Sequence, residues 1–535
     1  MAAAAATESP AIDLRSRRPF WFAAGLVLLV FFVAAGDPPP RVNEAHYLCR
    51  LKHFWDASYC RGDLFLDSPD AHFTVVWLFG WLTRILSLEA TAWAGRLLSW
   101  TLVAIGWTRL TGRVTRHGLL APLGASLFVL LTRHTHFAGE WIIGGFEAKS
   151  PAYGLVLIAL ADAIDRRWNR CWLLLGGASA LHALVGGWSV LALGVSAALA
   201  RRLPPVRSMA PGLAGGALLA LAGVAPALLL NRDSPPHLVD EANQIYVFVR
   251  LSHHLAPLTK PPEWLWARGW RHLLIIAALV WLHRRARSGN PSPARTAATL
   301  LAGYAWGAEA ISLTGLGIEL VGRNDPEWAA SLLKYYWFRL ADIATPAAAV
   351  VLLMRELAIC AERRRGAVVV AAASVAAAWY VGYHAIRHAQ QPPPPADQSM
   401  EDPVAWAQMT DWIRENTPEG SRFLVPRQSH TFKWRAERPE VVTWKDIPQD
   451  AESMVEWNRR YFDIFRRPGE EPREWAESLA SLGATRLREL GRQYDAPYVL
   501  DEAPDPAEPG PRASLPVVHR VGPYTLYWLG TGVPR

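Results

Sequence analysis

The feature that most constrains this chain is a series of long apolar stretches without a charged residue. Four of them cover residues 20–36, 118–131, 211–230 and 367–381. A helix needs about 20 apolar residues to cross a bilayer, and several of these stretches approach that length. Only 19% of the 535 residues are charged, against about 25% in an average soluble protein. The sequence therefore predicts a multi-spanning membrane protein.

Arginine clusters alternate with the apolar segments along the chain. The candidate spans are residues 20–36, 72–88, 90–110, 118–133, 151–163, 171–185, 186–200, 211–230, 270–283, 295–315, 338–357 and 366–386. The clusters begin at Arg15, Arg113, Arg166, Arg201, Arg284 and Arg363. The positive-inside rule places all of them in the cytoplasm. The segments left outside are 37–71, 134–150, 231–269 and 316–337. These clusters account for the net charge of +8, so nothing here indicates nucleic-acid binding.

Residues 72–88 do not fit this alternation, because an odd number of crossings must join the first outer loop, 37–71, to the inner cluster at Arg113. The segment is interrupted by Arg84 and followed by Glu89, which favours a helix in the headgroup plane. About eleven crossings of the inner (plasma) membrane follow, with the N-terminus in the cytoplasm and the C-terminus outside. Twelve crossings, with the tail in the cytoplasm, are the alternative.

The chain changes character near residue 390. We expect a cytoplasmic tail at 1–19, a helical transmembrane part at 20–390, a stiff proline-rich linker at 391–399 and a soluble domain at 400–535. Periodicity in the last part predicts both helices and strands. The expected helices are 404–416, 451–465 and 471–482, and the expected strands are 422–425, 441–444, 498–500, 517–521 and 524–528. The predicted fold is mainly α, with an α/β domain at its C-terminal end.

Two of the four cysteines, Cys49 and Cys60, fall in the first outer loop. An extracytoplasmic loop permits a disulfide between them. Two free thiols packed beneath the loop are the alternative.

The predicted outer segments are rich in ionisable side chains. With eleven crossings, fourteen of the sixteen histidines lie at or beyond the outer face. Ionisable groups at the edge of a membrane core are costly, and they mark functional sites by default. We therefore expect a polar cavity that opens outward. The candidate binding residues are His46, Lys149, His182, Arg250, His254, Arg339 and Asp342.

Each candidate also has a purely structural interpretation. Arg339 and Asp342 are three residues apart and could form only an internal ion pair on one helix face. Glu147 and Lys149 could simply cap the next span. The His253–His254 pair indicates a metal site only weakly, because no further ligand lies at a suitable spacing.

Three short motifs accompany this layout. They are residues 43–47 (Asn-Glu-Ala-His-Tyr), 89–97 (Glu-Ala-Thr-Ala-Trp-Ala-Gly-Arg-Leu) and 412–418 (Trp-Ile-Arg-Glu-Asn-Thr-Pro). Together with the N-inside first span, the long first outer loop and the C-terminal domain, they resemble the GT-C superfamily of polyprenyl-phosphate-sugar-dependent glycosyltransferases. The resemblance covers the whole chain in architecture, although its motifs are short. It implies transfer of a sugar, with inversion, from a polyprenyl phosphate to an acceptor at the outer face.

The first acidic residue of this family's early motif is commonly assigned as the catalytic base, and Asn43 stands there in this sequence. An amide does not accept a proton usefully at neutral pH. The resemblance therefore leaves the role of general base to Glu44, Asp56 or Glu147, with Glu140 a further candidate. A chain that has kept the fold and lost catalysis is the alternative.

The resemblance also implies the partners of such a site. Cations would hold the donor phosphate, and Arg250 and Arg339 suit this role because a guanidinium matches phosphate oxygens. His182 and His254 would contact phosphate or sugar hydroxyls. The lipid bilayer and a polyprenyl-phosphate-linked sugar are the expected partners, with an acceptor that the sequence does not specify. No cofactor is certain, and a divalent cation remains open.

Two other functions fit the same outer loops. A transporter or flippase would also have an outward cavity, but such proteins place ionisable residues near the midplane, often in two related halves. A catalytically silent membrane scaffold is the second alternative.

Overall fold

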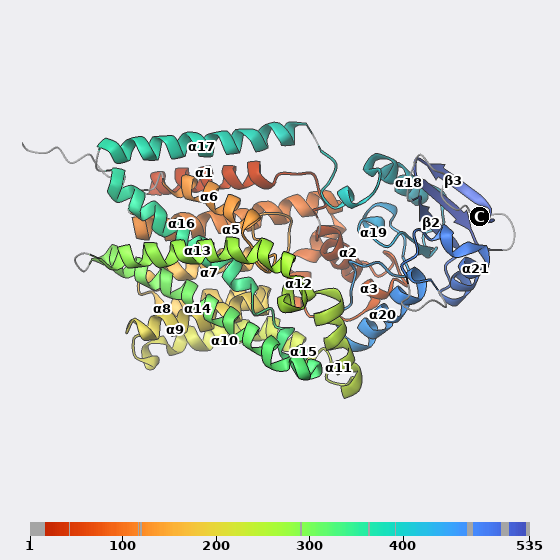
Figure 1. Ribbon diagram of the computed structural model, residues 1–535, viewed down its shortest axis with the longest axis horizontal. Coiled ribbons are helices and arrows are strands. Elements are labelled where there is room, and N and C mark those ends of the chain that lie inside the picture. The colour runs from red at the N-terminus through yellow and green to blue at the C-terminus, as the bar shows by residue number, and fades with distance from the viewer. Residues whose placement is uncertain are drawn as a thin grey trace, which may run out of the picture.

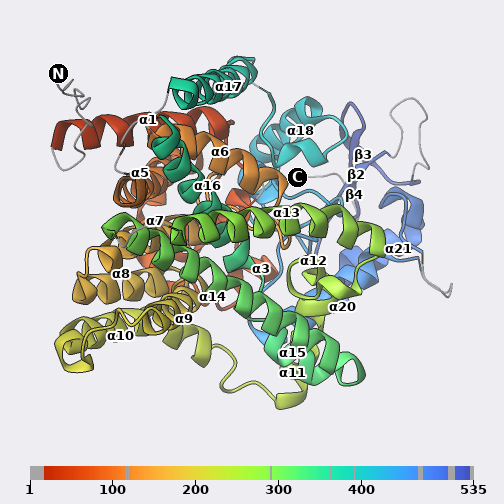
Figure 2. The same ribbon diagram turned by 60° about the vertical axis from the view of Figure 1, so that its left-hand side comes forward.

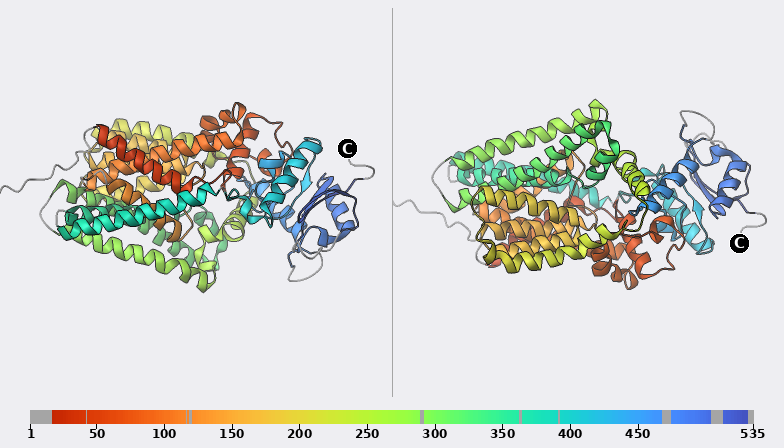
Figure 3. Two further views of the ribbon diagram at one scale, coloured as in Figure 1. Left: turned by 90° about the horizontal axis from the view of Figure 1, so that it is seen from above. Right: turned by 90° about the horizontal axis from the view of Figure 1, so that it is seen from below.

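The computed structural model describes residues 17–41, 43–115, 117, 120–288, 292–361, 364–390, 392–467, 474–503 and 513–530. Long helices run side by side through one part of the molecule, and a smaller mixed domain lies beyond one end of them (Figure 1). Short helices of the connecting segments lie between these two parts. The views from above and below agree on this arrangement (Figure 3).

Several helices of the array have the length and composition of membrane spans. Within the described residues, five helices are long and apolar enough, or up to six if the bent pair α5 and α6 is one span. The five are α1 (Arg17–Ala35), α10 (Val206–Leu229), α13 (Pro262–Arg287), α16 (Arg339–Ala361) and α17 (Arg364–Ala389). The bent pair is α5 (Leu88–Thr115) with α6 (Leu120–His134). The array is completed by α7 (Lys149–Ile164), α8 (Trp168–Leu181), α9 (Ala183–Leu199) and α14 (Pro293–Val321).

Glycines allow helices α8 and α10 to pack closely against each other. A Cβ atom added at Gly176 of α8 would lie 2.1 Å from the carbonyl oxygen of Gly216 on α10. A Cβ atom at Gly212 would lie 2.4 Å from Asn169 Cα. Small residues let membrane helices pack backbone against backbone, where van der Waals contact replaces the hydrophobic drive. The other face of α10 is exposed, as Leu218 and Leu228 show, and lipid can cover it.

The segment between α1 and α5 folds into short helices rather than one long one. These are α2 (Glu44–Trp55), α3 (Leu64–Asp67), α4 (Phe73–Phe79) and the 3₁₀ helix η1 (Gly80–Arg84). The apolar stretch at 72–88 is therefore split into elements too short to cross a bilayer. Its large side chains are nevertheless exposed, at Phe73, Trp77, Trp81 and Ile85. A membrane surface can cover such a face.

The segments between α10 and α13 and between α14 and α16 pack beside the C-terminal domain. They contain α11 (Pro236–Gln244), the π-helix η2 (Ile245–Arg250), α12 (Ser252–Leu255), η3 (Pro257–Thr259), η4 (Gly322–Asn324) and α15 (Pro326–Leu333). Helix α11 contacts α15 on one side and α20 (Ala451–Phe465) of the C-terminal domain on the other. Figure 2 shows these helices together at the lower edge of the molecule.

The C-terminal domain is built on a small mixed sheet. Its strands are β1 (Phe423–Leu424), β2 (Tyr498–Glu502), β3 (Val517–Val521) and β4 (Tyr524–Trp528), in the order β1-β2-β4-β3. Strand β1 is parallel to β2, whereas β4 is antiparallel to both β2 and β3. The remaining elements are η5 (Asp397–Ser399), α18 (Pro403–Asn416), α19 (Phe432–Ala436), η6 (Ala480–Leu482) and α21 (Gly483–Gln493).

Helices cover both faces of this sheet, and the alternation of β2 explains why. Tyr498 and Leu500 pack with Trp406 of α18, whereas Val499 between them packs with Leu487 of α21 and its neighbours. Successive side chains of a strand point to opposite faces. A strand that is apolar at every position, as β2 begins, therefore needs a core on each side.

Two sequence predictions in this domain are wrong. Residues 441–444 form no strand, because the chain leaves the sheet after a single bridge between Phe423 and Glu440. The predicted helix at 471–482 is also not found in the described residues 474–482, which contain only a bridge at Trp475 and the short η6. The helix instead begins at Gly483. The helices at 404–416 and 451–465 and the strands of the final hairpin are confirmed.

Candidate functional site

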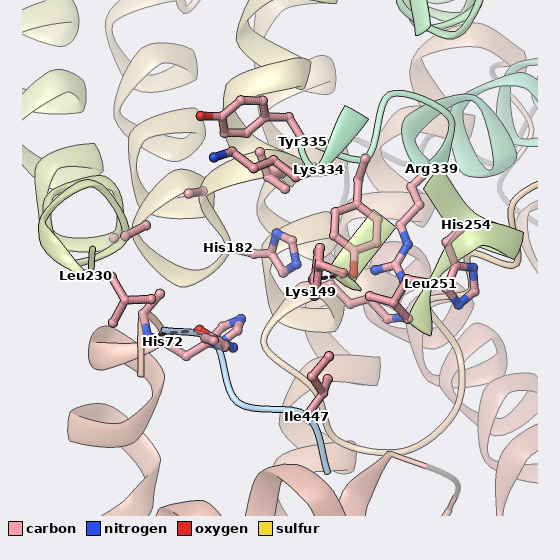
Figure 4. Close-up of a pocket in the computed structure, with 18 of the residues that line it drawn as sticks. His72, Lys149, His182, Leu230, Leu251, His254, Lys334, Tyr335, Arg339 and Ile447 are labelled. Carbon is pink, nitrogen blue, oxygen red and sulfur yellow. Dashed lines mark hydrogen bonds between the residues drawn. The ribbon is translucent and has the colours of Figure 1, made fainter. Parts of the chain in front are cut away.

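A cavity of about 530 Å³ lies where one end of the helical array meets the C-terminal domain. Its wall includes residues of α2, the turn between α8 and α9, the end of α10, the π-helix η2 and the start of α16. The segment 445–454 of the C-terminal domain closes it from the other side. Figure 4 shows Ile447 of this segment below His182 and Lys149 in the view. The cavity is therefore shared by both parts of the molecule.

The ionisable groups that line the cavity are mostly cationic. The cations are Lys149, Arg250, Lys334, Arg339 and Lys445, and the histidines are His46, His72, His182, His253 and His254. Among the described lining residues, Glu147 is the single carboxylate. A concave surface with one sign of charge and low-dielectric walls concentrates ligands of the opposite sign. The cavity is therefore suited to an anion.

One side of the cavity is apolar. It is formed by Leu181 and Leu184 at the turn between α8 and α9, and by Val224, Ala227 and Leu228 at the end of α10. Leu228 is 70% exposed, so this wall continues onto the outer surface of α10. The cavity therefore has a cationic interior, and its apolar wall continues onto the exposed surface of α10.

Glu147 places a carboxylate next to Asn43, the residue that stands where the early motif of the GT-C superfamily has its first acidic residue. Its Oε1 atom accepts a hydrogen bond from Asn43 Nδ2 at 2.5 Å. Its Oε2 atom lies 3.1 Å from Lys149 Nζ. Glu147 is only 3% exposed, and this small exposed part faces the cavity. A carboxylate that is 104 positions away in the sequence therefore stands beside the asparagine of the early motif.

Lys149 and Arg339 belong to a chain of alternating charges behind Glu147. Lys149 Nζ lies 3.0 Å from Glu140 Oε1, and Arg339 Nε lies 3.1 Å from Glu140 Oε2. The rings of Trp141 and Tyr336 stack on the two cations at 4.2 and 3.9 Å. Two carboxylates and two cations compensate each other, as buried ions must. Arg339 thus pairs with Glu140 and not with Asp342.

Asp342 does not line the cavity, but it holds the loop that carries two of these carboxylates. Its side chain accepts hydrogen bonds from the backbone N–H groups of Phe137, Ala138 and Glu140, at 2.6, 2.9 and 3.1 Å. The Ala138 carbonyl also bonds with the ring of His254. Asp342 is therefore a positioning residue for the segment 135–148.

Glu44 and Asp56 lie outside the cavity. Glu44 is completely buried and forms a two-point ion pair with Arg96, whose Nε atom is 2.6 Å from Oε1. It also accepts the N–H of Phe146 at 2.7 Å. Asp56 is exposed and bonds to Ser58, which lowers the pKa of its carboxyl group. Neither carboxylate can reach a ligand in the cavity.

The other predicted binding residues are brought together. His46, Lys149, His182, Arg250, His254 and Arg339 all line this one cavity. Burial lowers the pKa of His253 to about 4 and that of His254 well below its ordinary value. Both imidazoles are therefore neutral at pH 7. Neutral rings act as hydrogen-bond partners for hydroxyl groups rather than as counter-ions.

The sequence interpretation missed the contribution of the C-terminal domain, above all Lys445. Arg250 Nε donates a hydrogen bond to the carbonyl oxygen of Trp444 at 2.7 Å. His46 Nδ1 lies 2.8 Å from Asp446 Oδ1. These two bonds flank Lys445 and direct its segment to the cavity. The Lys-Asp pair that interrupts an apolar run at 441–447 was the only signal in the sequence.

A buried charge cluster attaches this domain to the segment that joins α2 to α3. Lys433 Nζ lies within 3.2 Å of Asp63, 2.6 Å of Glu440 and 2.5 Å of Asp446. These charges raise the pKa of Lys433 well above its ordinary value, despite the opposing effect of burial. A charge that is buried in this way needs its partners. The cluster therefore fixes the domain relative to α2 and α3.

No group of three or more histidine, cysteine or acidic side chains that could hold a metal ion occurs among the described residues. Cys49 and Cys60 are both buried and free. Burial raises the pKa of Cys49 to about 12, and its sulfur accepts a hydrogen bond from the Tyr59 hydroxyl at 3.3 Å.

Comparison with known proteins gives distant likenesses. Residues 404–464 match a family model described as "Domain of unknown function (DUF6798)". No curated protein matches the sequence. The structure is similar to ArnT from Cupriavidus metallidurans bound to undecaprenyl phosphate, with 13% identity and a TM-score of 0.39 over 96% of this chain and 98% of that chain.

Two further solved structures are similar at the same level. One is an oligosaccharyltransferase from Archaeoglobus fulgidus in complex with Zn and sulfate, with 13% identity and a TM-score of 0.48 over 90% of this chain and 67% of that chain. The other is the arabinofuranosyltransferase AftD from Mycobacteria, with 17% identity and a TM-score of 0.48 over 97% of this chain and 42% of that chain. The likeness to these GT-C glycosyltransferases spans nearly the whole chain and concerns overall fold alone.

Proposed function

We propose that this protein is a membrane glycosyltransferase that moves a sugar from a polyprenyl phosphate to an acceptor hydroxyl. The observation that supports this most is the position of Glu147. It is the one carboxylate among the described residues of a cationic cavity, and it is hydrogen-bonded to Asn43 of the early motif. A site of this kind pairs a proton acceptor with an anion-binding surface.

In the proposed reaction, Glu147 acts as general base. It takes the proton of the acceptor hydroxyl while the hydroxyl oxygen attacks the anomeric carbon of the sugar. The bond from that carbon to the donor phosphate breaks, and the electron pair leaves with the phosphate. Attack opposite the leaving group in a single displacement inverts the anomeric configuration. A positioned base contributes about 10²–10⁴ in rate, and cations stabilise the charge that develops on the phosphate.

The apolar wall provides a place for the polyprenyl chain. Leu181, Leu184, Val224 and Leu228 lead from the cavity to the outer face of α10. A lipid tail that lies along this face would remain in the bilayer while its phosphate enters the cationic interior. An enzyme with a water-soluble donor would not need such a wall.

We further propose that the eleven long helices of the described chain are eleven crossings, with the cavity and the C-terminal domain outside the cytoplasm. Arg113, Arg166 and Arg201 lie at or just beyond the C-terminal ends of α5, α7 and α9. The cavity is lined from the opposite ends of α7 and α9, by Lys149 and Ala183, so these arginines lie at the other end of the helical array. The positive-inside rule assigns that end to the cytoplasm. The segment 72–88, which the sequence assigns to the membrane surface, forms the short helices α4 and η1 and ends at the first residue of α5.

The proposal is tested by release of labelled sugar from a polyprenyl-phosphate donor by the purified protein, with candidate acceptors and with water. We expect Glu147→Gln to lower the rate about 10²–10⁴-fold while the protein remains folded, because Lys149 keeps Glu140 as a partner. Asp56→Asn is the matched control, since Asp56 is exposed outside the cavity. Parallel reactions with a divalent cation or a chelator test for a metal requirement. Equal rates for wild type and Glu147→Gln would refute the assignment.

A further inference from the structure

The cations of the cavity differ in how far their charge is compensated. Lys149 and Arg339 share the carboxylates Glu140 and Glu147, so these four groups carry no net charge. Lys334 Nζ donates a hydrogen bond to Asn243 Oδ1 at 3.1 Å, and the carboxylate of Asp240 acts on its charge. Arg250 and Lys445 remain, and they come from different parts of the molecule.

Arg250 presents the free end of its guanidinium to the cavity. Its Nε atom is used for the Trp444 carbonyl, and the indole ring of Trp444 lies 5.0 Å from the guanidinium carbon. Neither Nη atom forms a hydrogen bond with a described residue. Arg250 ends the π-helix η2, a distortion that is frequent at functional sites. One edge of the fork is therefore fixed and the other is available.

Lys445 is the neighbour of the residue that Arg250 holds. Its ammonium group forms no hydrogen bond or ion pair with the part of the chain that the structure describes. The nearest carboxylate along the chain, Asp446, is already taken by Lys433 and His46. Burial, together with the charge of Arg250, lowers the pKa of Lys445 to about 8. Two cations that have no ion-pair partner among the described residues therefore face one cavity, and the charge of Arg250 repels that of Lys445.

We propose that Arg250 and Lys445 form a split phosphate-binding site, in which the C-terminal domain supplies half of the contacts to the donor phosphate. This inference rests on the proposed function and adds the identity of the headgroup contacts. A phosphate between the two groups would relieve their repulsion and accept bonds from a guanidinium edge and an ammonium. Arg339, which the sequence favoured for this role, is occupied by Glu140.

The site has a consequence for how the protein works. The donor phosphate can be held only when the segment 443–449 is in place, and that segment is fixed by the Arg250–Trp444 and His46–Asp446 bonds. The C-terminal domain therefore takes part in donor binding rather than only covering the cavity.

The test is equilibrium binding of a labelled polyprenyl monophosphate to the full-length protein in detergent, with the matching polyprenol as the headgroup-free control. Lys445→Gln is compared with Lys334→Gln, which removes the same charge from the same cavity. A hydrogen bond to a charged group contributes about 1.5–3 kcal/mol. We therefore expect Lys445→Gln and Arg250→Gln each to weaken binding about tenfold or more, and Lys334→Gln less than about threefold. Lys445→Arg should restore most of the affinity.

The outcomes separate this inference from the function on which it rests. If Lys445→Gln and Lys334→Gln weaken binding equally, the cavity acts only by its total charge and the split site is wrong, although the glycosyltransferase proposal stands. If the wild type binds polyprenol as tightly as the phosphate, or binds neither, both proposals are overturned. Unchanged binding by Lys445→Gln likewise excludes the role of the C-terminal domain.

Discussion

Glu44 and Glu147 carry the same side chain but differ in their surroundings, and their hydrogen-bond and ion-pair partners determine the difference. Glu44 has no exposed surface and forms a two-point pair with Arg96, so it stabilises the fold of the first outer loop. Glu147 has an amide and an ammonium as partners and still faces the cavity. A sequence shows both as glutamates near aromatic residues. The two carboxylates differ in their partners and in their surroundings. Only Glu147 keeps a face open to the cavity.

Lys445 is expected to make donor binding depend on pH. Its ordinary pKa of 10.5 is lowered to about 8 in the folded protein, so the free protein loses this charge as the pH rises through 8. Affinity for a polyprenyl phosphate should be constant from pH 7 to about 8 and then fall by up to about tenfold per pH unit. Binding measured between pH 7 and 9.5 tests this.

The other titratable and charged groups around Lys445 do not produce the same dependence of donor binding on pH. Those that act on it or are affected by it are Arg250, Glu147, Asp446, Lys149, His46 and His430. Burial lowers the pKa of both histidines, that of His430 to about 4, so neither changes charge above pH 7. In Lys445→Arg the guanidinium stays charged, and the decline above pH 8 should disappear. A decline that persists in this variant would assign it to another group.

Lys445 should also lower the stability of the empty protein. The unfolded chain holds this proton more tightly than the folded one, so the cost of burying the ammonium is complete below pH 8 and shrinks as the pH rises toward 10.5. A destabilising buried ammonium group is expected at the phosphate site that we propose for Lys445.

At the scale of elements, the segment 135–148 between α6 and α7 carries the carboxylate that lines the cavity, Glu147, although it has no regular secondary structure. Three of its backbone N–H groups end on the single carboxylate of Asp342 at the start of α16. A loop that brings Glu140 and Glu147 to one cavity depends on this attachment, because it has no helix or strand to hold it.

We expect Asp342→Ala to release this loop. Three buried N–H groups would lose their acceptor, at a cost of about 1–3 kcal/mol each for those left unsatisfied, and Glu147 would lose its fixed position. Sugar transfer should fall at least about tenfold, and proteolysis within residues 135–148 should become faster. Glu356→Gln, on the same helix and paired with Arg285, is the control and should leave both properties unchanged. A loop that stays protected in Asp342→Ala would contradict this role.

Helices were easier to predict than the connections between them. Apolar stretches bounded by arginines located α10, α13 and α17, because lipid and backbone hydrogen bonding leave a helix as the only solution for such a stretch. The segment 441–444 looked like a strand because it is β-branched and aromatic. Its flanking residues Glu440 and Asp446 are drawn to Lys433, and this contact with distant groups overrode local propensity.

At the scale of the whole molecule, the C-terminal domain is fixed by the Lys433 cluster. Lys433→Met would leave Asp63, Glu440 and Asp446 buried without their cation, which typically costs about 3–5 kcal/mol. We expect a lower melting temperature, faster cleavage between the helical array and the domain, and loss of polyprenyl-phosphate binding although Lys445 is intact.

Lys52→Met is the matched control for this interface. Lys52 pairs with Glu437 at 2.8 Å, but the glutamate side chain is 39% exposed. Exposed pairs contribute about 1 kcal/mol or less, so this variant should bind the donor normally. Donor binding by Lys433→Met equal to that of Lys52→Met would show that the cluster does not position the cavity.

The orientation of the molecule can be measured with its own cysteines. Cys360 is the one exposed cysteine, whereas Cys49, Cys60 and Cys171 are buried. It lies at the end of α16, beside the arginines that the positive-inside rule assigns to the cytoplasm. A membrane-impermeant maleimide should label it in inverted vesicles and not in right-side-out vesicles. Val404→Cys, at an exposed position of α18, should show the opposite pattern, and labelling of both sites from one side would exclude eleven crossings.

The sequence by itself determined that this is a largely helical membrane protein with a mixed domain at its C-terminal end, because apolar length and arginine placement are local properties of the chain. The sequence also predicted that the candidate polar residues lie at one end of the helical array. Only the tertiary structure decided which carboxylate faces the cavity and which cations are free, because charge compensation depends on contacts between residues far apart in the sequence. Two contacts illustrate this. Glu147 is hydrogen-bonded to Asn43, and the bond from Arg250 to Trp444 brings the neighbouring Lys445 to the cavity. Neither contact can be read from a local sequence pattern.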